Sequence, residues 1–203
     1  ALRAGDYAKA FSKAVMTSRL TKPMVDDAKR LLQLLGIPFV EAPGEAEAQA
    51  AYMAMKGDVW ASSSHDYDSL LFGAPLLLRY LTISGREFLP SKGISRPLKP
   101  ELIDLEKLLS HHELTRNQLI DLAILIGTDF NEGIKGIGPK TALKLTKKYG
   151  RLENLPSSIK SRIPQHYQDV RKIFSAPEVT PNYSLEYGNL REDELYDFLC
   201  GQR

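Results

Sequence analysis

The sequence predicts an α/β fold in which helices flank a buried, parallel sheet, followed by a helical and basic region. Three short apolar runs alternate with helical patterns over about the first 130 residues: 37–40, 58–61 and 76–80. Short apolar strands that alternate with helices are typical of a parallel sheet covered on its faces. After Pro100 the pattern becomes helical, with Gly and Pro between the segments.

The helices of the first part are delimited by helix-start and helix-stop residues. Residues 1–20 have a helical and basic pattern, and Thr21 is expected to cap a second helix that ends at Gly36. A third helix is predicted over residues 44–56, stopped by Gly57. In the second part, helices are predicted over 101–110, 115–126, 139–149, 165–174 and 192–199.

The composition is that of an ordinary globular protein, with 43% hydrophobic and 26% charged residues. No apolar run reaches the roughly 18 residues of a membrane span, so no membrane partner is expected. The single cysteine, Cys200, excludes an internal disulfide and fits a reducing setting. The expected location is therefore intracellular, in the cytoplasm of a prokaryote or the nucleus of a eukaryote, and a monomer is expected.

Charge is distributed unevenly along the chain. Residues 36–72 hold six acidic residues and one lysine, whereas residues 131–172 hold ten basic and three acidic residues. A basic segment suits a polyanion, and an acidic cluster beside apolar strands suits cations. Solvated faces of opposite sign would give the same numbers, so charge alone does not decide between these interpretations.

Five acidic residues stand where the pattern places helix starts and strand ends: Glu45, Glu47, Asp66, Asp68 and Asp129. The two glutamates open a helix, and the two aspartates follow an apolar run, where an i, i+2 pair in extended chain shares one face. If these carboxylates converge, their oxygens suit Mg²⁺ or Mn²⁺. Two such ions about 3.5–4 Å apart would support phosphodiester hydrolysis. The alternative is that the acids are helix-terminal charges and turn formers.

The stretch GIKGIGPKT resembles a nucleotide-binding loop, because Gly133 and Gly138 have the right spacing before Lys140. However, Pro139 interrupts the motif, and the loop follows a helix instead of a strand. Gly138 and Pro139 suit a helix start whose free N–H groups can hold a phosphate. Because Lys144 lies one turn after Lys140, we expect the turn to bind a DNA backbone phosphate without reading sequence. A nucleotide hydrolase or a merely structural turn are the alternatives.

Taken together, four segments resemble the flap endonuclease family of structure-specific 5′ nucleases. They are EAPGEAEAQAAYM, SHDYDSLLFGAP, LAILIGTDFNEGIKGIGPKTALKL and EDELYDFLCG, which occur in family order and span nearly the whole chain. The resemblance implies a PIN-like nuclease core over residues 21–130 and a helix–two-turn–helix DNA-binding region within residues 131–203. Residues 1–20 would then be the lower part of the arch that threads the 5′ single strand.

The resemblance also assigns roles to individual residues. It implies metal ligation and catalysis by the five acids: Glu45, Glu47, Asp66, Asp68 and Asp129. It implies DNA binding by the glycine turn and the helix after it: Gly133, Gly136, Gly138, Lys140, Thr141 and Lys144. The cofactors would be two Mg²⁺ ions, replaceable by Mn²⁺, with K⁺ at the glycine turn. The substrate would be branched or 5′-flap DNA, cleaved in replication and repair.

Two portions of the family pattern have no counterpart in this sequence. Family members carry a further N-terminal portion with central strands and two more metal-binding aspartates, and a C-terminal tail that binds the sliding clamp. We therefore expect a fragment, a cleaved product or one chain of a split protein. A non-catalytic DNA-binding fragment is the main alternative to a flap endonuclease.

Overall fold

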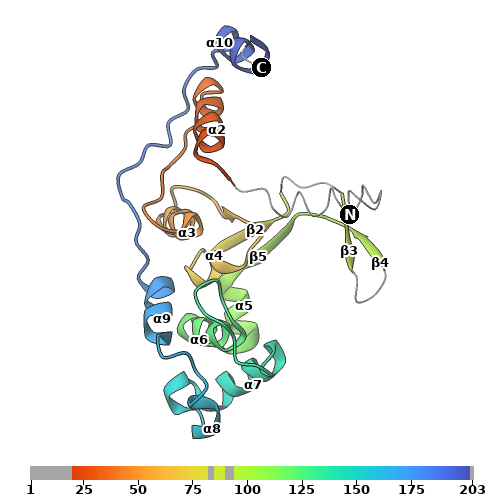
Figure 1. Cartoon of the computed structure of the whole chain (residues 1–203), viewed down its shortest axis with the longest axis vertical. Helices are drawn as coiled ribbons and strands as arrows, with labels where there is room; N and C mark the ends of the chain where they lie inside the picture. The colour runs from red at the N-terminus through yellow and green to blue at the C-terminus, as the bar shows by residue number, and fades with distance from the viewer. Residues whose placement is uncertain (1–19, 82–84, 90–93, 202–203) are drawn as a thin grey trace, which may run out of the picture. The chain divides into compact units, whose positions relative to one another are not determined.

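The computed structural model describes residues 20–81, 85–89 and 94–201, which Figure 1 shows in colour. They form two compact units, one made of the described residues up to Glu41 with those from Asn182 onward, the other of Ala42–Pro181. The helix predicted over residues 1–20 lies, except for Leu20, outside the described residues. Every other residue predicted to have a functional role belongs to the second unit.

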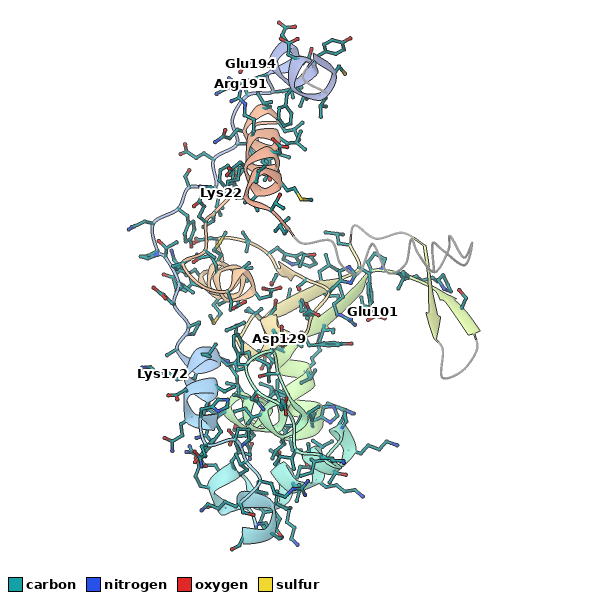
Figure 2. The ribbon with its side chains drawn as sticks, in the orientation of Figure 1. Lys22, Glu101, Asp129, Lys172, Arg191 and Glu194 are labelled. Atoms are coloured by element: carbon teal, nitrogen blue, oxygen red, sulfur yellow. The ribbon has the colours of Figure 1, made fainter. Side chains whose placement is uncertain are left out.

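The first unit pairs two helices that are far apart in sequence. Helix α2 spans Lys22–Leu34 and helix α10 spans Glu192–Tyr196, with a π-helical turn, η3, over Asp197–Gly201. Arg30 of α2 and Glu194 of α10 form an ion pair at 2.8 Å, and Glu194 is labelled in Figure 2. Thr21 occupies the predicted capping position, but its side chain makes no capping hydrogen bond.

The second unit contains a small mixed sheet. Its strands are β1 (Ser62–Ser63), β2 (Leu76–Arg79) and β5 (Glu101–Asp104), in the order β1-β2-β5. Strands β1 and β2 are parallel, as predicted, whereas β2 and β5 are antiparallel. A separate hairpin, β3 (Arg86–Leu89) and β4 (Ile94–Pro97), was not predicted.

Three predicted elements are wrong in type or position, two of them in this unit and one, residues 37–40, in the first. Residues 101–104 form strand β5 instead of the start of a helix, because Asp104 caps the helix by accepting a hydrogen bond from Lys107 N and so sets its start at Leu105. The strand predicted over 58–61 lies at Ser62–Ser63. Residues 37–40 are not a strand, and among the described residues they pair with none.

Helices cover the sheet and extend into the basic region (Figure 1). They are α3 (Ala46–Lys56), α4 (Asp68–Leu71), α5 (Leu105–His112), α6 (Arg116–Ile126), α7 (Pro139–Tyr149), the 3₁₀ turn η2 (Leu152–Asn154), α8 (Ser157–Lys160) and α9 (Tyr167–Ser175). Most of their apolar faces share one core, in which Phe72, Ile124 and Phe174 are almost fully buried, while α5 packs with Leu70 and Leu77 in a second, smaller cluster. Among the described residues, no helix combines the length and apolarity that crossing a membrane needs.

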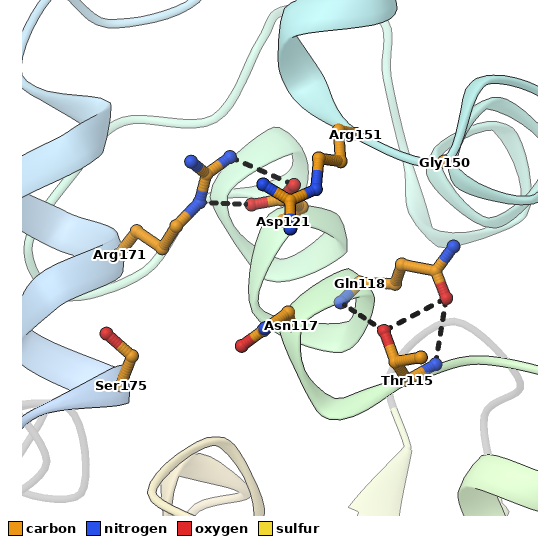
Figure 3. A pocket seen from close by; sticks show the side chains of 8 residues that line it. All are labelled: Thr115, Asn117, Gln118, Asp121, Gly150, Arg151, Arg171 and Ser175. Atoms are coloured by element: carbon orange, nitrogen blue, oxygen red, sulfur yellow. Dashed lines mark hydrogen bonds and ion pairs between the residues drawn. The ribbon is translucent and has the colours of Figure 1, made fainter.

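A charged network joins α6 to α9 in the helical part. The Arg171 guanidinium donates to both carboxylate oxygens of Asp121, at 2.8 and 3.0 Å, beside a cavity of about 510 Å³ (Figure 3). Arg171 also hydrogen bonds Glu153 at 2.8 Å, which lowers the pKa of that carboxyl to about 2. Burial raises the pKa of Asp121 despite its bond to Arg171. The network therefore fixes α9 against α6, the helix that leads into the predicted site.

Candidate metal centre and DNA-binding turn

The five predicted acids lie on three segments that are remote in sequence. Glu45 is the N-cap of α3 and Glu47 lies in its first turn, as predicted. Asp66 and Asp68 lie where the chain passes from β1 into α4. Asp129, labelled in Figure 2, lies on the turn that leaves α6.

The carboxyl group of Asp68 shows that these segments face one another. Burial raises the pKa of Asp68, because a half-buried carboxylate loses part of its hydration. The other four carboxylates raise this pKa further by charge repulsion, in the order Asp129, Asp66, Glu47 and Glu45. The fold therefore brings negative charge from three segments to bear on the Asp68 carboxyl.

The Asp66–Asp68 pair does not have the extended backbone that the sequence predicted. Asp66 lies in a bend, and Asp68 is the first residue of α4. Hydrogen bonds hold the segment: Asp66 N–H donates to Ser64 Oγ at 3.1 Å, and Ser64 Oγ donates to Glu47 Oε1 at 3.2 Å. The turn that carries the aspartates is thus held by hydrogen bonds and contacts Glu47.

Asp129 lies at the tip of a tight turn that its neighbours close. Thr128 and Asn131 exchange two backbone hydrogen bonds, at 3.0 and 3.2 Å, and Thr128 Oγ1 donates to Asn131 Oδ1 at 2.8 Å. The buried Asn131 amide group also donates to Ile124 O at 2.9 Å. Asp129 is exposed, so its carboxylate is free of the bonds that hold the turn.

The glycine turn begins with a close approach of two backbone segments. A Cβ atom on Gly133 would lie 1.7 Å from the carbonyl oxygen of Ile126, so only glycine fits there. Gly127, with φ +115°, faces Gly133 from the other side, and Ile134 N–H donates to Leu125 O at 3.0 Å. This contact anchors the turn against the end of α6.

The rest of the turn buries its isoleucines and exposes its polar groups. Ile134 and Ile137 are buried, while Gly136, with φ +86°, and Gly138 are exposed. Gly138 is the N-cap of α7, and Pro139 opens the helix, as the sequence predicted. The backbone N–H groups of the first turn of α7 therefore lack intrahelical acceptors.

Two exposed lysines follow the turn on α7. Lys140 and Lys144 have no acidic partner within 4 Å among the residues that the structure describes. Lys147, by contrast, pairs with Glu113 at 3.0 Å. Thr141, which was also predicted to bind DNA, is exposed beside Lys140. The structure therefore presents a positive helix start on the segment that follows Asp129 along the chain.

The acids suit a hard divalent cation chemically, because carboxylate oxygens are the ligands that Mg²⁺ and Mn²⁺ prefer. Within the described ranges, however, no three acidic, histidine or cysteine side chains lie close enough together to hold a metal ion. The five assignments stay predictions. The sequence did not predict the groups that support the acids, which are Ser64, Asn131 and the contact between Gly127 and Gly133. Of these, only the glycine contact had a signal in the sequence, the Gly-x-x-x-x-x-Gly spacing.

Comparison with known proteins finds relatives that match nearly the whole chain. Residues 36–129 match the family model described as the XPG I-region. Flap endonuclease 1 from Ignicoccus hospitalis is 51% identical over 199 residues, which are 98% of this chain and 57% of that relative. The chain thus spans less than two thirds of the curated relatives it matches.

Solved structures share the fold. Flap endonuclease-1 from Methanococcus jannaschii gives a TM-score of 0.80 at 41% identity, with coverage of 100% of this chain and 59% of that one. The catalytic core of Rad2 in complex with DNA substrate gives a TM-score of 0.74 at 22% identity, over 97% of this chain and 68% of that chain. The likeness to Rad2 concerns the fold alone.

Proposed function

Because the chain belongs to the flap endonuclease family, we propose that it contributes to a structure-specific nuclease that hydrolyses phosphodiester bonds of 5′-flap DNA. In this proposal residues 21–130 form part of a PIN-like nuclease core. Residues 131–203 supply the helix–two-turn–helix region that holds duplex DNA. The biological setting would be replication and repair, where branched DNA arises.

The observation that carries the proposal is that α3 and the turns before α4 and after α6 bring four other carboxylates near Asp68, whose pKa is raised by burial and by their charge. Placing unpaired acids near one another lowers the stability of a protein through charge repulsion, so such an arrangement indicates a function. Mg²⁺, or Mn²⁺ in its place, would supply a water activated for attack and charge stabilisation at the leaving oxygen. The five acids would hold these ions.

The protein's own residues would position the DNA. The exposed N–H groups at the start of α7 and the side chains of Lys140 and Lys144 would bind a backbone phosphate of the duplex. Carbonyl oxygens of the turn around Gly136 would hold a K⁺ ion. Since Asp129 and the turn share one connection from α6, binding at the turn would set the distance from duplex to acids.

A cleavage assay with the 203-residue chain tests the proposal. A 5′-flap duplex is incubated with Mg²⁺ or with EDTA, and binding is measured in parallel by fluorescence anisotropy. We expect cleavage only with Mg²⁺, loss of cleavage in Asp129→Ala, and unchanged binding. Glu106→Ala, which removes an exposed acid of α5, is the matched control and should cut normally. Equal cleavage by the Asp129→Ala chain would refute the metal assignment.

A second candidate function is DNA binding without catalysis. It is favoured by the lack of a three-acid group within metal-binding distance among the described residues. In the same assay this candidate predicts binding to flap DNA that weakens with salt, with no cleavage in Mg²⁺ or Mn²⁺.

A further inference from the structure

Arg79 is a buried arginine at the end of β2 whose hydrogen bonds converge on the segment that carries two of the acids. The residue is 8% exposed. Its Nε donates to the backbone carbonyl of His65 at 3.0 Å, and its Nη2 donates to the hydroxyl of Tyr80 at 2.8 Å. Its Nη1 donates to the Tyr67 hydroxyl and to Glu101 Oε2, the latter at 3.3 Å. All three guanidinium nitrogens are thus used.

Two tyrosine rings also enclose the guanidinium. Its central carbon lies 4.0 Å from the centre of the Tyr67 ring and 4.5 Å from that of Tyr80. Tyr80 has a φ of +58°, a left-handed backbone that aromatic residues rarely adopt. The Tyr80 ring contacts the His65 ring edge-on, with centroids 5.1 Å apart. Such backbone strain persists only where the surroundings enforce it, and it clusters near functional sites.

The contacts of Arg79 lie on both sides of Asp66. The carbonyl that it binds belongs to the residue before Asp66, and the ring and hydroxyl that it holds belong to the residue after. His65, Asp66 and Tyr67 are themselves exposed, so core packing does little to hold them. Carboxylates that repel one another move apart unless the backbone that carries them is restrained.

We propose that Arg79 is a positioning residue: it fixes the segment 65–67 so that Asp66 and Asp68 face the acidic cluster and can bind a divalent cation. The inference rests on the proposed function of that cluster as a metal site. Arg79 does not touch the cation in this proposal. It acts through the backbone carbonyl of His65 and the side chain of Tyr67, as residues around metal ligands commonly act through the ligands' surroundings.

The geometry calls for an arginine in particular. A planar guanidinium can donate to the His65 carbonyl through Nε and to two other acceptors through its Nη atoms, while its faces stack on aromatic rings. A lysine would keep the positive charge near Glu101 but could not make these contacts together. The substitution Arg79→Lys therefore separates geometry from charge.

The experiment measures metal affinity and loop protection in the 203-residue chain. Mn²⁺ affinity is measured by titration with electron paramagnetic resonance, and amide hydrogen exchange is followed in peptides that cover residues 64–68. In Arg79→Lys and Arg79→Met we expect Mn²⁺ affinity about tenfold weaker, as for other residues that support ligands. Exchange in residues 64–68 should be faster in both. The wild-type site is identified by the loss of binding in Asp66→Ala.

Arg171→Met is the matched control, because Arg171 is a partly buried arginine that also makes several hydrogen bonds, yet these bonds reach none of the five acids. It should lower stability and leave both Mn²⁺ affinity and exchange in residues 64–68 unchanged. Unchanged exchange in Arg79→Met, or full recovery in Arg79→Lys, would overturn the positioning role. If the wild-type chain shows no Mn²⁺ site that depends on Asp66, the proposed function fails, while the exchange data alone still decide the role of Arg79.

Discussion

Gly133→Ala is expected to destabilise the second unit severely, because the new methyl group has no space. Its Cβ would lie 1.7 Å from Ile126 O and 2.3 Å from the carbonyl carbon of the same residue, against 3.4 Å for ordinary contact. Both neighbours are backbone atoms, so no side chain can rotate away. Overpacking of this kind costs about 3 kcal/mol. The displaced turn would also lose the Ile134 N–H to Leu125 O bond, worth about 1 kcal/mol, so we expect about 4 kcal/mol in total.

Two other glycines separate this steric cost from the cost of backbone conformation. Gly57 has φ +80° and open space around its Cβ direction, so Gly57→Ala should cost only about 1 kcal/mol. Gly138 has open space and φ −94°, so Gly138→Ala should change stability by less than about 0.5 kcal/mol. Urea unfolding followed by circular dichroism at fixed pH measures all three. Equal midpoints for Gly133→Ala and Gly138→Ala would refute the reasoning.

Two further predictions concern charge. The pKa of Glu153 is lowered from 4.5 to about 2 by Arg171, so its contribution to stability is present above pH 4.5 and is lost as the pH falls towards 2. As the pH falls from 4.5 towards 2, the urea midpoint of Glu153→Gln should therefore decrease less than that of the wild type. Plots of midpoint against pH that run parallel for the two proteins would contradict this. Replacing Lys140 and Lys144 by alanine should weaken duplex binding and lower its salt slope by roughly 2, whereas Lys147→Ala, which removes an already paired lysine, should lower it less. Anisotropy titrations at several salt concentrations decide between these outcomes.

The elements predicted correctly are those that local sequence specifies. Gly57 ends α3 in a left-handed conformation, and Gly138 with Pro139 starts α7, because these residues act through their own backbone. Helix α6 begins directly after its N-cap Thr115, whose capping box with Gln118 needs only a three-residue spacing. In each case the determining contact lies within one turn of the residue that signals it.

The wrong predictions concern contacts between distant segments. Residues 101–104 have an apolar pattern that suits a helix as well as a strand, and only the pairing with β2 decides for the strand. Asp66 and Asp68 were expected on one face of an extended chain, but the turn is set by Ser64 and by contacts with α3 and β2. Neither partner can be identified from the residues next to the aspartates in sequence.

The candidate site shows the same division between chemical groups and their supports. Carboxylates at helix starts and after strands were recognisable by type, and the rise in the pKa of Asp68, caused by burial and by the other four, indicates that these lie near it. In our proposal the Arg79 guanidinium, which has no catalytic chemistry, holds the aspartate segment, and the bare Cα of Gly133 lets the turn after Asp129 pack against α6. Acids that repel one another stay together only if such supports resist them. The precision of a site of this kind therefore resides in residues whose sequence signal is weak, and substitutions there should reveal the site as clearly as substitutions of the acids.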